Sequence, residues 1–419
     1  MAKTCYINAR ILVGNGEVIE NGILVVRHEQ STGKLPVLSD TLEFAGPQQD
    51  WELSGEEEII DCQGYTLMPG LYDVDSHLDT LNTSQNDYVD NLGTAYRTYI
   101  SFRNASEALV AGVTALRITG MPDGIDLALK SAYQKNMVFG PTLFVSGPEY
   151  TTTAGYGTDV YGTEQCSGAN AFRGAARVNL SHGLDLLHLC ISSDRRSLTD
   201  GEYEKQMSDS EIAALTDLAH AFGKPVSAHC AGDASIQTAL CHNITCVEHG
   251  LMASEETVRS MAQAGAYFVP ALCSTESYDE QTVEEHRSMV RMAIEQKVRI
   301  CVGTNGLASE PAVGTTAVIR ELELLCELGM SGMDAIISAT SNSASLCGDR
   351  NGGLLKAGKR PDFIAVKGNP DQDIHLMRNL ALVVKNGRTV YSGMAAKAVY
   401  PFHIHAPSYS VKGGTTHIW

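Results

Sequence analysis

Hydrophobic and polar positions follow a strand-like pattern in the first part of the chain. Short apolar runs, bounded by glycine, serine and proline turns, predict strands at Cys5–Val13, Gly22–Arg27 and Glu57–Cys62. The polar segment Glu29–Gly55 predicts a loop or insertion. Because three strands cannot close a core by themselves, another part of the chain must complete this sheet.

The C-terminal part offers the missing strands. Asp362–Val366 has the pattern of a strand. Ala381–Lys385 and Arg388–Tyr391 flank Asn386-Gly387, which favours a hairpin because Asn-Gly suits a type I′ turn. The last stretch, Pro401–Trp419, shows no clear period, so we expect its histidines to be tail residues rather than ligands: His403, His405 and His417.

Between these ends, strand-like segments alternate with helical ones. A clear helix is Asp209–Phe222, with Ser208 and Glu211 spaced as a capping box. Further helices are predicted at Glu255–Ala264, Thr282–Gln296 and Thr316–Leu328. The predicted strands are Leu71–Ser76, Thr114–Ile118, Thr142–Ser146, Asp185–Cys190, Pro225–His229, Thr245–His249, Tyr267–Ala271 and Arg299–Gly303.

Eight strands alternating with helices are typical of an α/β fold with a (β/α)8, TIM-like barrel. We therefore predict three segments: 1–68 as the N-terminal part of a small composite β-sandwich, 69–348 as the barrel, and 349–419 as the C-terminal part of the sandwich with a tail.

Composition narrows the partners and the compartment. The formal net charge of −18 argues against nucleic acid or an anionic membrane surface as a partner. The N-terminus lacks the pattern of a signal peptide, and no apolar run is long enough for a membrane span. The 11 cysteines include no CxxC and several lie in apolar runs, which is typical of reduced, buried thiols and predicts a cytoplasmic location.

The stretch Thr66–Asp79 contains a cluster of acidic and histidine side chains. After the Pro69-Gly70 turn, four polar residues alternate with other side chains: Asp73, Asp75, His77 and Asp79. An extended strand would place all four on one face, where their charges favour a bound cation. A solvated loop explains this stretch equally well.

Other polar residues end the predicted barrel strands. His188, His229 and His249 lie at the ends of strands four, five and six, and Asn305 follows strand eight. In a barrel these positions meet at one mouth. Imidazoles that converge in this way predict a site for zinc or a similar ion, although a single histidine on an apolar strand is more often a core residue.

Several of these blocks resemble the amidohydrolase superfamily, in its prolidase-like and imidazolonepropionase-like branch. PGLYDVDSH is similar to the strand-one signature PGLIDxHxH, and PVSAHC, CVEHG and CVGTN are similar to the blocks of strands five, six and eight. GVTALRITG and GPTLFVSGPEYTTTAGYG resemble strands two and three, and GGLLKAGKRPDFIAVKGNPDQDI with VVKNGRTVY resembles the C-terminal return to the sandwich. The resemblance covers nearly the whole chain and implies a metal-dependent barrel.

The chain departs from the family's pattern at several site positions. The first histidine of the HxH pair is replaced by Asp75, the bridging carboxylated lysine by His188, and the strand-eight aspartate by Asn305. Tyr156 stands where the strand-three loop has a histidine. An imidazole cannot bridge two metals as a carbamate does, so His188 argues against a binuclear metal centre. An amide cannot act as a base, so Asn305 cannot take over the proton transfer.

The resemblance, with these departures, implies a mononuclear site for one divalent metal, zinc by preference, with the ligands His188, His229, His249 and His77. Asp75 is then the candidate base, Asn305 a hydrogen-bond donor to substrate, and His77 a further catalytic candidate. Arg117 could bind a substrate carboxylate or form a structural ion pair, and Tyr156 could donate a hydrogen bond or form a wall.

Three hypotheses follow for function. The first is hydrolysis of an amide, lactam or peptide-like C–N bond of a small molecule, which predicts bound zinc or manganese. The second is a non-hydrolytic lyase, isomerase or cyclase on the same barrel, with or without metal. The third is a non-catalytic paralogue. Like many barrel enzymes, the protein is expected to be a homo-oligomer.

Overall fold

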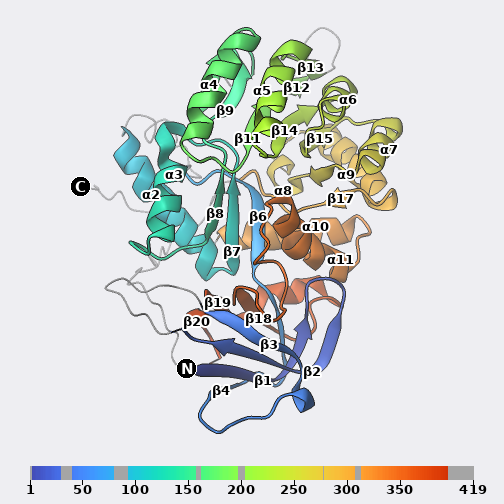
Figure 1. Cartoon of the computed structure of the whole chain (residues 1–419). Helices are drawn as coiled ribbons and strands as arrows, with labels where there is room; N and C mark the ends of the chain where they lie inside the picture. Colours follow the sequence, from blue (N-terminus) through green and yellow to red (C-terminus); the bar gives the residue numbers. More distant parts are fainter. Residues whose placement is uncertain are drawn as a thin grey trace, which may run out of the picture.

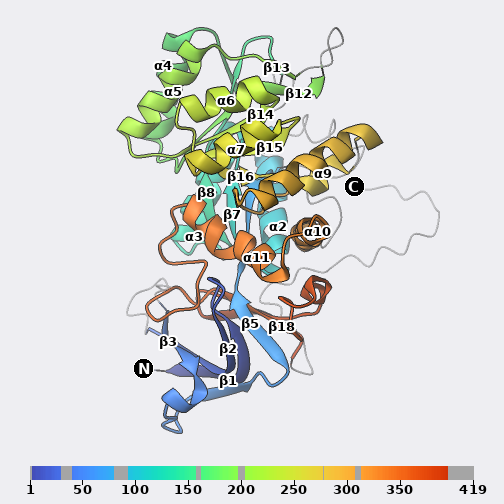
Figure 2. The ribbon, with the colours of Figure 1, turned by 90° about the vertical axis from the view of Figure 1, so that its right-hand side faces the viewer.

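A computed structural model gives the fold and describes residues 2–29, 40–79, 93–156, 162–196, 203–276, 278–306 and 313–394. Figure 1 shows the N-terminal strands in blue beside the C-terminal strands in red at one end of the molecule. The larger α/β part occupies the other end, and Figure 2 shows the same division from the side. The predicted tail Pro401–Trp419 lies outside the described residues.

Both ends of the chain build one mixed sheet, which we call the terminal β domain. Its strand order is β20-β19-β18-β5-β1-β2-β3, with β4 paired to β1. β18 runs antiparallel to β5, with Ala365 opposite Leu67. Asn386 and Gly387 both have positive φ, 49° and 74°, which confirms the predicted hairpin. The strands are β1 (Lys3–Leu12), β2 (Val18–Arg27), β3 (Thr41–Pro47), β4 (Glu58–Asp61), β5 (Tyr65–Pro69), β18 (Phe363–Lys367), β19 (Leu380–Lys385) and β20 (Arg388–Ser392).

The loop predicted at Glu29–Gly55 is wrong in part, because this segment contains β3 and the short helix η1 (Gln48–Asp50). β3 pairs antiparallel with β2. Leu42 is buried, and the ring of Phe44 lies 5.3 Å from that of Trp51. A few apolar side chains are therefore enough to anchor this strand within a mostly polar segment. Residues 30–39 of the segment lie outside the described part.

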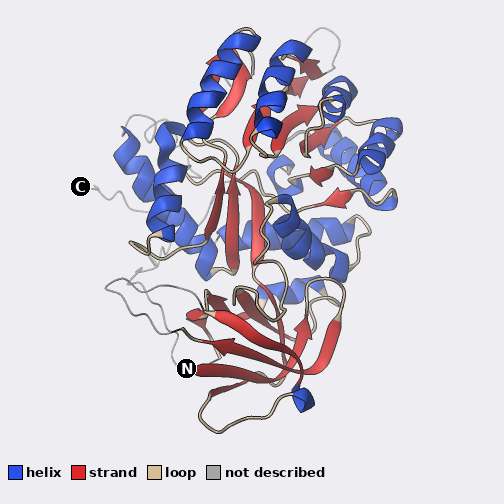
Figure 3. Ribbon diagram, in the orientation of Figure 1, coloured by secondary structure: helices blue, strands red, loops and turns tan. Residues whose placement is uncertain are grey.

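The barrel follows the predicted rhythm, and each of the eight predicted strand segments overlaps an observed strand. Figure 3 shows the helices outside these strands. Strand three is split into β8 and β9 around Ser146-Gly147-Pro148, so that β8 pairs with β7 while β9 pairs with β11. The barrel strands are β6 (Leu71–Ser76), β7 (Val113–Ile118), β8 (Thr142–Val145), β9 (Glu149–Thr152), β11 (Leu187–Cys190), β14 (Val226–Ala231), β15 (Cys246–Leu251), β16 (Tyr267–Val269) and β17 (Arg299–Ile300).

The barrel closes between its first and last strands. Val74 N–H donates to the carbonyl of Val302 at 2.9 Å, and Ser76 forms a bridge with Gly306. A Cβ atom at Gly303 would lie 2.5 Å from Cβ of Asp75, so only glycine allows this approach. The closure places Asp75 beside the residues that follow β17. The domain limits 1–68, 69–348 and 349–419 stay a prediction.

The four predicted helices are present, although the one predicted from Thr282 begins at Glu280 and the one predicted from Thr316 begins at Val313. Ser208 and Glu211 form the predicted capping box of α5, whose observed range differs from the prediction by one residue at its end. The helices are α2 (Gly93–Val110), η2 (Pro122–Gly124), α3 (Ile125–Gln134), α4 (Ala169–Ser181), α5 (Asp209–Ala221), α6 (Asp233–Cys241), α7 (Glu255–Ala264), α8 (Leu272–Thr275), α9 (Glu280–Glu295), α10 (Val313–Glu327), α11 (Gly332–Ile337), η3 (Ser338–Asn342), α12 (Ser343–Leu346) and η4 (Ile374–Arg378). Short strands outside the barrel are β10 (Thr163–Cys166), β12 (Ser192–Arg196) and β13 (Tyr203–Lys205).

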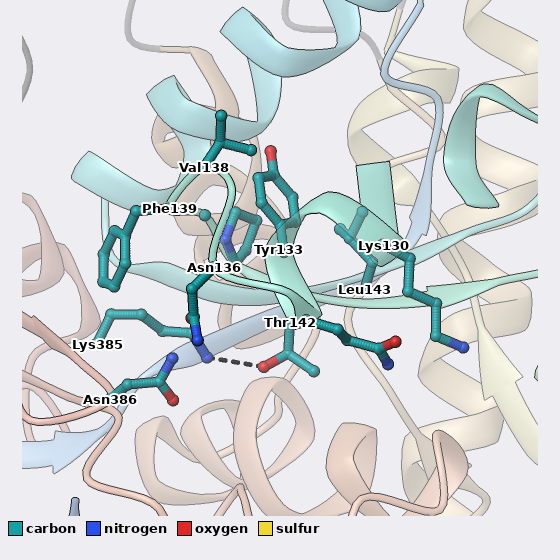
Figure 4. A pocket seen from close by; sticks show the side chains of 12 residues that line it. Lys130, Tyr133, Asn136, Val138, Phe139, Thr142, Leu143, Lys385 and Asn386 are labelled. Atoms are coloured by element: carbon teal, nitrogen blue, oxygen red, sulfur yellow. Dashed lines mark hydrogen bonds between the residues drawn. The ribbon is translucent and has the colours of Figure 1, made fainter. Parts of the chain in front are cut away.

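A buried ion cluster joins the barrel to the terminal β domain, and we call it the junction cluster: Tyr72, Asp349, Arg360, Asp362 and Lys385. Lys385 Nζ donates to Asp362 Oδ2 at 2.5 Å and to Thr142 Oγ1 at 2.7 Å. Figure 4 shows the second of these bonds at the edge of a cavity of about 110 Å³. Burial lowers the pKa of Lys385 to about 8, although Asp362 opposes the shift.

The cysteines and the apolar character of the helices test two further predictions from the sequence. All eleven cysteines are free thiols, and those predicted to be core residues are buried: Cys190, Cys230, Cys246 and Cys301. In the described ranges, no helix has both the length and the apolar character that crossing a bilayer requires.

Candidate active site

A cavity of about 140 Å³ opens at the carboxyl ends of the barrel strands. It contains every predicted site residue except Arg117. The side chains therefore converge from strands that are far apart in the sequence, as a barrel requires. The lining residues are Asp75, His77, Glu149, Tyr156, His188, His229, His249, Leu251, Thr275, Tyr278 and Asn305.

Asp75 is the most deeply buried carboxylate of this cavity, with 1% of its surface exposed. Its Oδ1 accepts a hydrogen bond of 2.5 Å from Thr119 Oγ1, whereas its Oδ2 has no hydrogen-bond partner. Burial alone would raise the pKa of Asp75, but the imidazoles of His249 and His77 lower it below its usual value. Asp75 is therefore charged at neutral pH and keeps one oxygen open.

His188 is held between carboxyl groups. Its Nε2 lies 3.1 Å from Glu149 Oε1, and its Nδ1 shares a hydrogen bond of 2.9 Å with Ser227 Oγ. Glu248 Oε2 lies 3.2 Å from Nδ1, close enough for an ion pair but without hydrogen-bond geometry. Burial opposes a charge on the ring, but the surrounding carboxyl groups, Glu248 first, raise the pKa of His188 to about 9. The imidazole is thus protonated at neutral pH.

His229 and His249 lie side by side, with ring centroids 4.4 Å apart. Burial and the neighbouring imidazoles lower the pKa of His229 well below its usual value, so its ring is neutral, and its Nε2 has no hydrogen-bond partner. His249 has φ of 63°, a conformation that costs a non-glycine residue about 1–2 kcal/mol. His286 Nε2 donates a hydrogen bond of 2.9 Å to its carbonyl oxygen, which supports this strained residue.

His77 and Tyr156 complete the wall. His77 Nε2 lies 3.0 Å from Asn305 Oδ1, and because that oxygen only accepts, the imidazole donates. The amide nitrogen of Asn305 then remains a donor. The ring of Tyr156 lies 5.6 Å from that of His229, so it forms an aromatic wall beside this imidazole.

Arg117 does not reach the cavity. It is 2% exposed, and its Nη2 lies 2.6 Å from Glu248 Oε1 while its Nε donates to the carbonyl of Val74. The structure thus places Arg117 in a buried ion pair inside the barrel, the alternative that the sequence left open. A substrate carboxylate cannot reach this guanidinium without displacing Glu248.

The carboxyl groups that hold His188 were not predicted from the sequence. Glu248 directly precedes His249 in CVEHG, and Glu149 begins β9 in GPEYTT. A signal was available for Glu248, which directly precedes the candidate ligand His249, whereas no candidate site residue adjoins Glu149 in the sequence. Asp73 and Asp79, which alternate with Asp75 and His77, have other partners: Asp73 accepts from Thr304, and Asp79 pairs with Arg97 at 2.5 Å.

The family resemblance implies a metal, and the donor atoms test whether one fits. Asp75 Oδ2 and His229 Nε2 are open, but both nitrogens of His188 contact other side chains and His77 Nε2 binds Asn305. Within the part of the chain that the structure describes, no group of three or more His, Cys, Asp or Glu side chains could hold a metal ion. The arrangement therefore does not fit the ligand set predicted from the sequence: His77, His188, His229 and His249.

These features define a barrel with a polar cavity at its strand ends. The sequence profile described as "Amidohydrolase family" matches residues 66–390, so the chain belongs to this family and the resemblance is confirmed. The family's hydrolases act on amide-type bonds. An ochratoxinase of Aspergillus niger is 26% identical over 423 residues, which cover 90% of this chain and 84% of the relative.

Solved structures share the fold. A Xaa-Pro dipeptidase with bound methionine has a TM-score of 0.79 at 22% identity, covering 93% of this chain and all (100%) of the other. The A. niger ochratoxinase structure has a TM-score of 0.78 at 23% identity and covers 93% and 96% of the two chains. The predicted (β/α)8 barrel with a β-rich domain from both chain ends is therefore confirmed.

Proposed function

We propose that the protein hydrolyses an amide, lactam or peptide-like C–N bond of a small molecule in this cavity. Family membership supports the reaction class, and the similar proteins named for ochratoxin and for Xaa-Pro dipeptides support a peptide-like bond. A water molecule takes roughly 30 Å³ of liquid volume, so a cavity of about 140 Å³ has room for the reacting amide group and one water.

The observation that carries the proposal is a pair of open polar atoms on buried side chains of the cavity, Asp75 Oδ2 and His229 Nε2. Leaving such atoms without partners costs about 1–3 kcal/mol each, a cost that is tolerated where a ligand completes the bonds. Asp75 is oriented through Thr119 and can accept a proton from an attacking water. Because its pKa is lowered, Asp75 is ionised at neutral pH and acts as a weak base.

Two other side chains would act on the substrate carbonyl. The amide nitrogen of Asn305 donates to its oxygen, and the protonated His188 places a positive charge near the negative charge that develops there. Tyr156 would form a wall beside His229, which is one of its two predicted roles. These roles involve no metal, because the described donors do not form a metal site.

A second candidate is a non-hydrolytic proton-transfer reaction on the same barrel. One observation favours it: a protonated imidazole, His188, and an ionised carboxylate, Asp75, line the same cavity. An acid and a base so arranged could serve a lyase, isomerase or cyclase without activating water.

The test is turnover of a panel of small amides and lactams by protein purified without chelator, with elemental analysis of the same sample. Asp75→Asn and His229→Ala should abolish product formation, and His220→Ala, an exposed histidine of α5, is the matched control. Release of a free amine supports hydrolysis. Products of unchanged or eliminated mass would instead select the second candidate. Stoichiometric zinc or manganese, with loss of activity on chelation, would show that a metal takes part in spite of the poor fit of the described donors.

A further inference from the structure

The cavity carries more negative than positive charge. Asp75 and Glu149 line it, whereas no lysine or arginine is among its described lining residues. Two arginines with described side chains are already paired: Arg117 with Glu248 and Arg97 with Asp79. His188 supplies one positive charge, but both of its nitrogens are engaged.

The barrel segments outside the described residues contain no lysine or arginine, whereas Arg195 and Arg196 of β12 are basic residues whose side chains are not described. The segments are 80–92, 157–161, 197–202 and 307–312. Their charged residues are all acidic: Asp87, Asp90, Asp159, Asp200, Glu202 and Glu310. This composition does not compensate for the negative charge in the cavity.

Glu149 is the carboxyl group best placed to meet a ligand. It begins β9, opposite His188 in the register with β11. Its side chain is 18% exposed, compared with 4% for His188, so it lies on the open side of this pair. One oxygen contacts His188 Nε2, and its second oxygen has no partner among the described side chains.

We propose that the substrate carries a positive charge, such as an ammonium group, next to the scissile amide bond and that Glu149 binds it. This inference rests on the proposed function, because it assumes that the bound molecule is hydrolysed. The preference for a positive charge can be tested by binding alone. A charge-assisted hydrogen bond to Glu149 would be lost with a neutral analogue, and an anionic analogue would be repelled by the two cavity carboxyl groups.

The experiment uses three p-nitroanilides that share one amide bond: L-alanine p-nitroanilide, its N-acetyl form and its N-succinyl form. At about pH 6.5 they are cationic, neutral and anionic, because an α-amino group has a pKa of about 7.7–8.0. We expect kcat/KM to fall by about tenfold or more from the first to the second and again to the third. In Glu149→Gln the ratio between the cationic and neutral substrates should approach one, whereas Glu295→Gln, at an exposed position on α9, should keep it.

A binding measurement separates this inference from the proposed function. The thermal shift produced by L-alaninamide is compared with that of N-acetyl-L-alaninamide and of zinc chloride alone. A thermal shift with the cationic amide only, lost in Glu149→Gln, supports the inference. If none of the anilides is hydrolysed, that result counts against the proposed hydrolysis and not against the charge preference. Equal or absent shifts, a preference for the anionic substrate, or zinc binding that increases turnover of the neutral substrate would each overturn it.

Discussion

The mouth of the barrel and the junction cluster both bury charge, but they satisfy it differently. At the junction, Asp362 accepts from Lys385, from Arg360 and from the backbone N–H of Asn386. At the mouth, Asp75 has Thr119 as a partner for one oxygen and none for the other. Both carboxylates are nearly inaccessible, with 6% of Asp362 and 1% of Asp75 exposed.

This difference teaches that burial does not by itself identify a functional carboxylate. A fully paired cluster stabilises the fold, because removing one member leaves the others charged and buried. A carboxylate with an open oxygen in a cavity is available to a ligand instead. Matched changes at the two places can therefore separate activity from stability.

The largest effect is expected for Asp75→Asn. Asparagine keeps an acceptor for Thr119 Oγ1 but loses the charge and the basicity, so kcat should fall by about 10²–10⁴-fold. The free energy of unfolding should stay within about 1 kcal/mol of the wild type. Steady-state kinetics and urea unfolding measure the two quantities, and Asp217→Asn, at an exposed position of α5, is the control. Activity that survives the change would remove Asp75 from the proposed reaction.

The same substitution at the junction should have the opposite outcome. Asp362→Asn leaves the buried Lys385 and the partly buried Arg360 without their shared carboxylate, and the free energy of unfolding should fall by about 3–5 kcal/mol. The kcat of the folded variant should remain close to that of the wild type. A stable but inactive Asp362→Asn protein would contradict the assignment of the junction cluster to stability and of the barrel mouth to activity.

A pH-dependent effect is expected at His188. Its pKa is raised to about 9 in the folded protein from 6.5, so its stabilising contribution is fully present below pH 6.5 and disappears as pH rises through 9. The wild type should therefore lose up to about 3 kcal/mol relative to His188→Gln over this interval. Urea unfolding of both proteins at several pH values measures the difference. A constant difference would show that the carboxyl groups do not hold the imidazole protonated.

The smallest effect is expected for Tyr156→Phe. Because the ring packs beside His229 as a wall, kcat/KM should change by less than about twofold, and a fall of about two- to tenfold would show instead that the hydroxyl binds the substrate. Tyr99→Phe, at an exposed position of α2, is the control. A larger fall would place the hydroxyl in the chemical step.

The order of the elements was predictable because each barrel strand is a short apolar run bounded by polar residues or turns. Strand-end residues such as His77, His188 and Asn305 could therefore be assigned to one mouth. Pairing between distant residues was not predictable. Whether Arg117 meets a substrate or Glu248 depends on the approach of β7 to β15 across the barrel, which no local pattern records.

The same limit applies to the ligands of the imidazoles. Glu149 contacts His188 only because strand three breaks at Gly147-Pro148 and β9 then pairs with β11. No local sequence pattern indicates this break, so His188 was predicted to be a metal ligand without a carboxyl partner. β3 was missed for a related reason, since its pairing with β2 decides its conformation more than its own composition does.

The pairing of β5 with β18 has a consequence for synthesis on the ribosome. β5 is translated before the barrel and β18 after it, so one side of β5 stays without its neighbour until nearly the whole protein has emerged. A nascent chain must keep that exposed strand from pairing with other polypeptides during this delay. Early termination anywhere before Phe363 would leave the vulnerable side permanently uncovered and should yield an aggregating product.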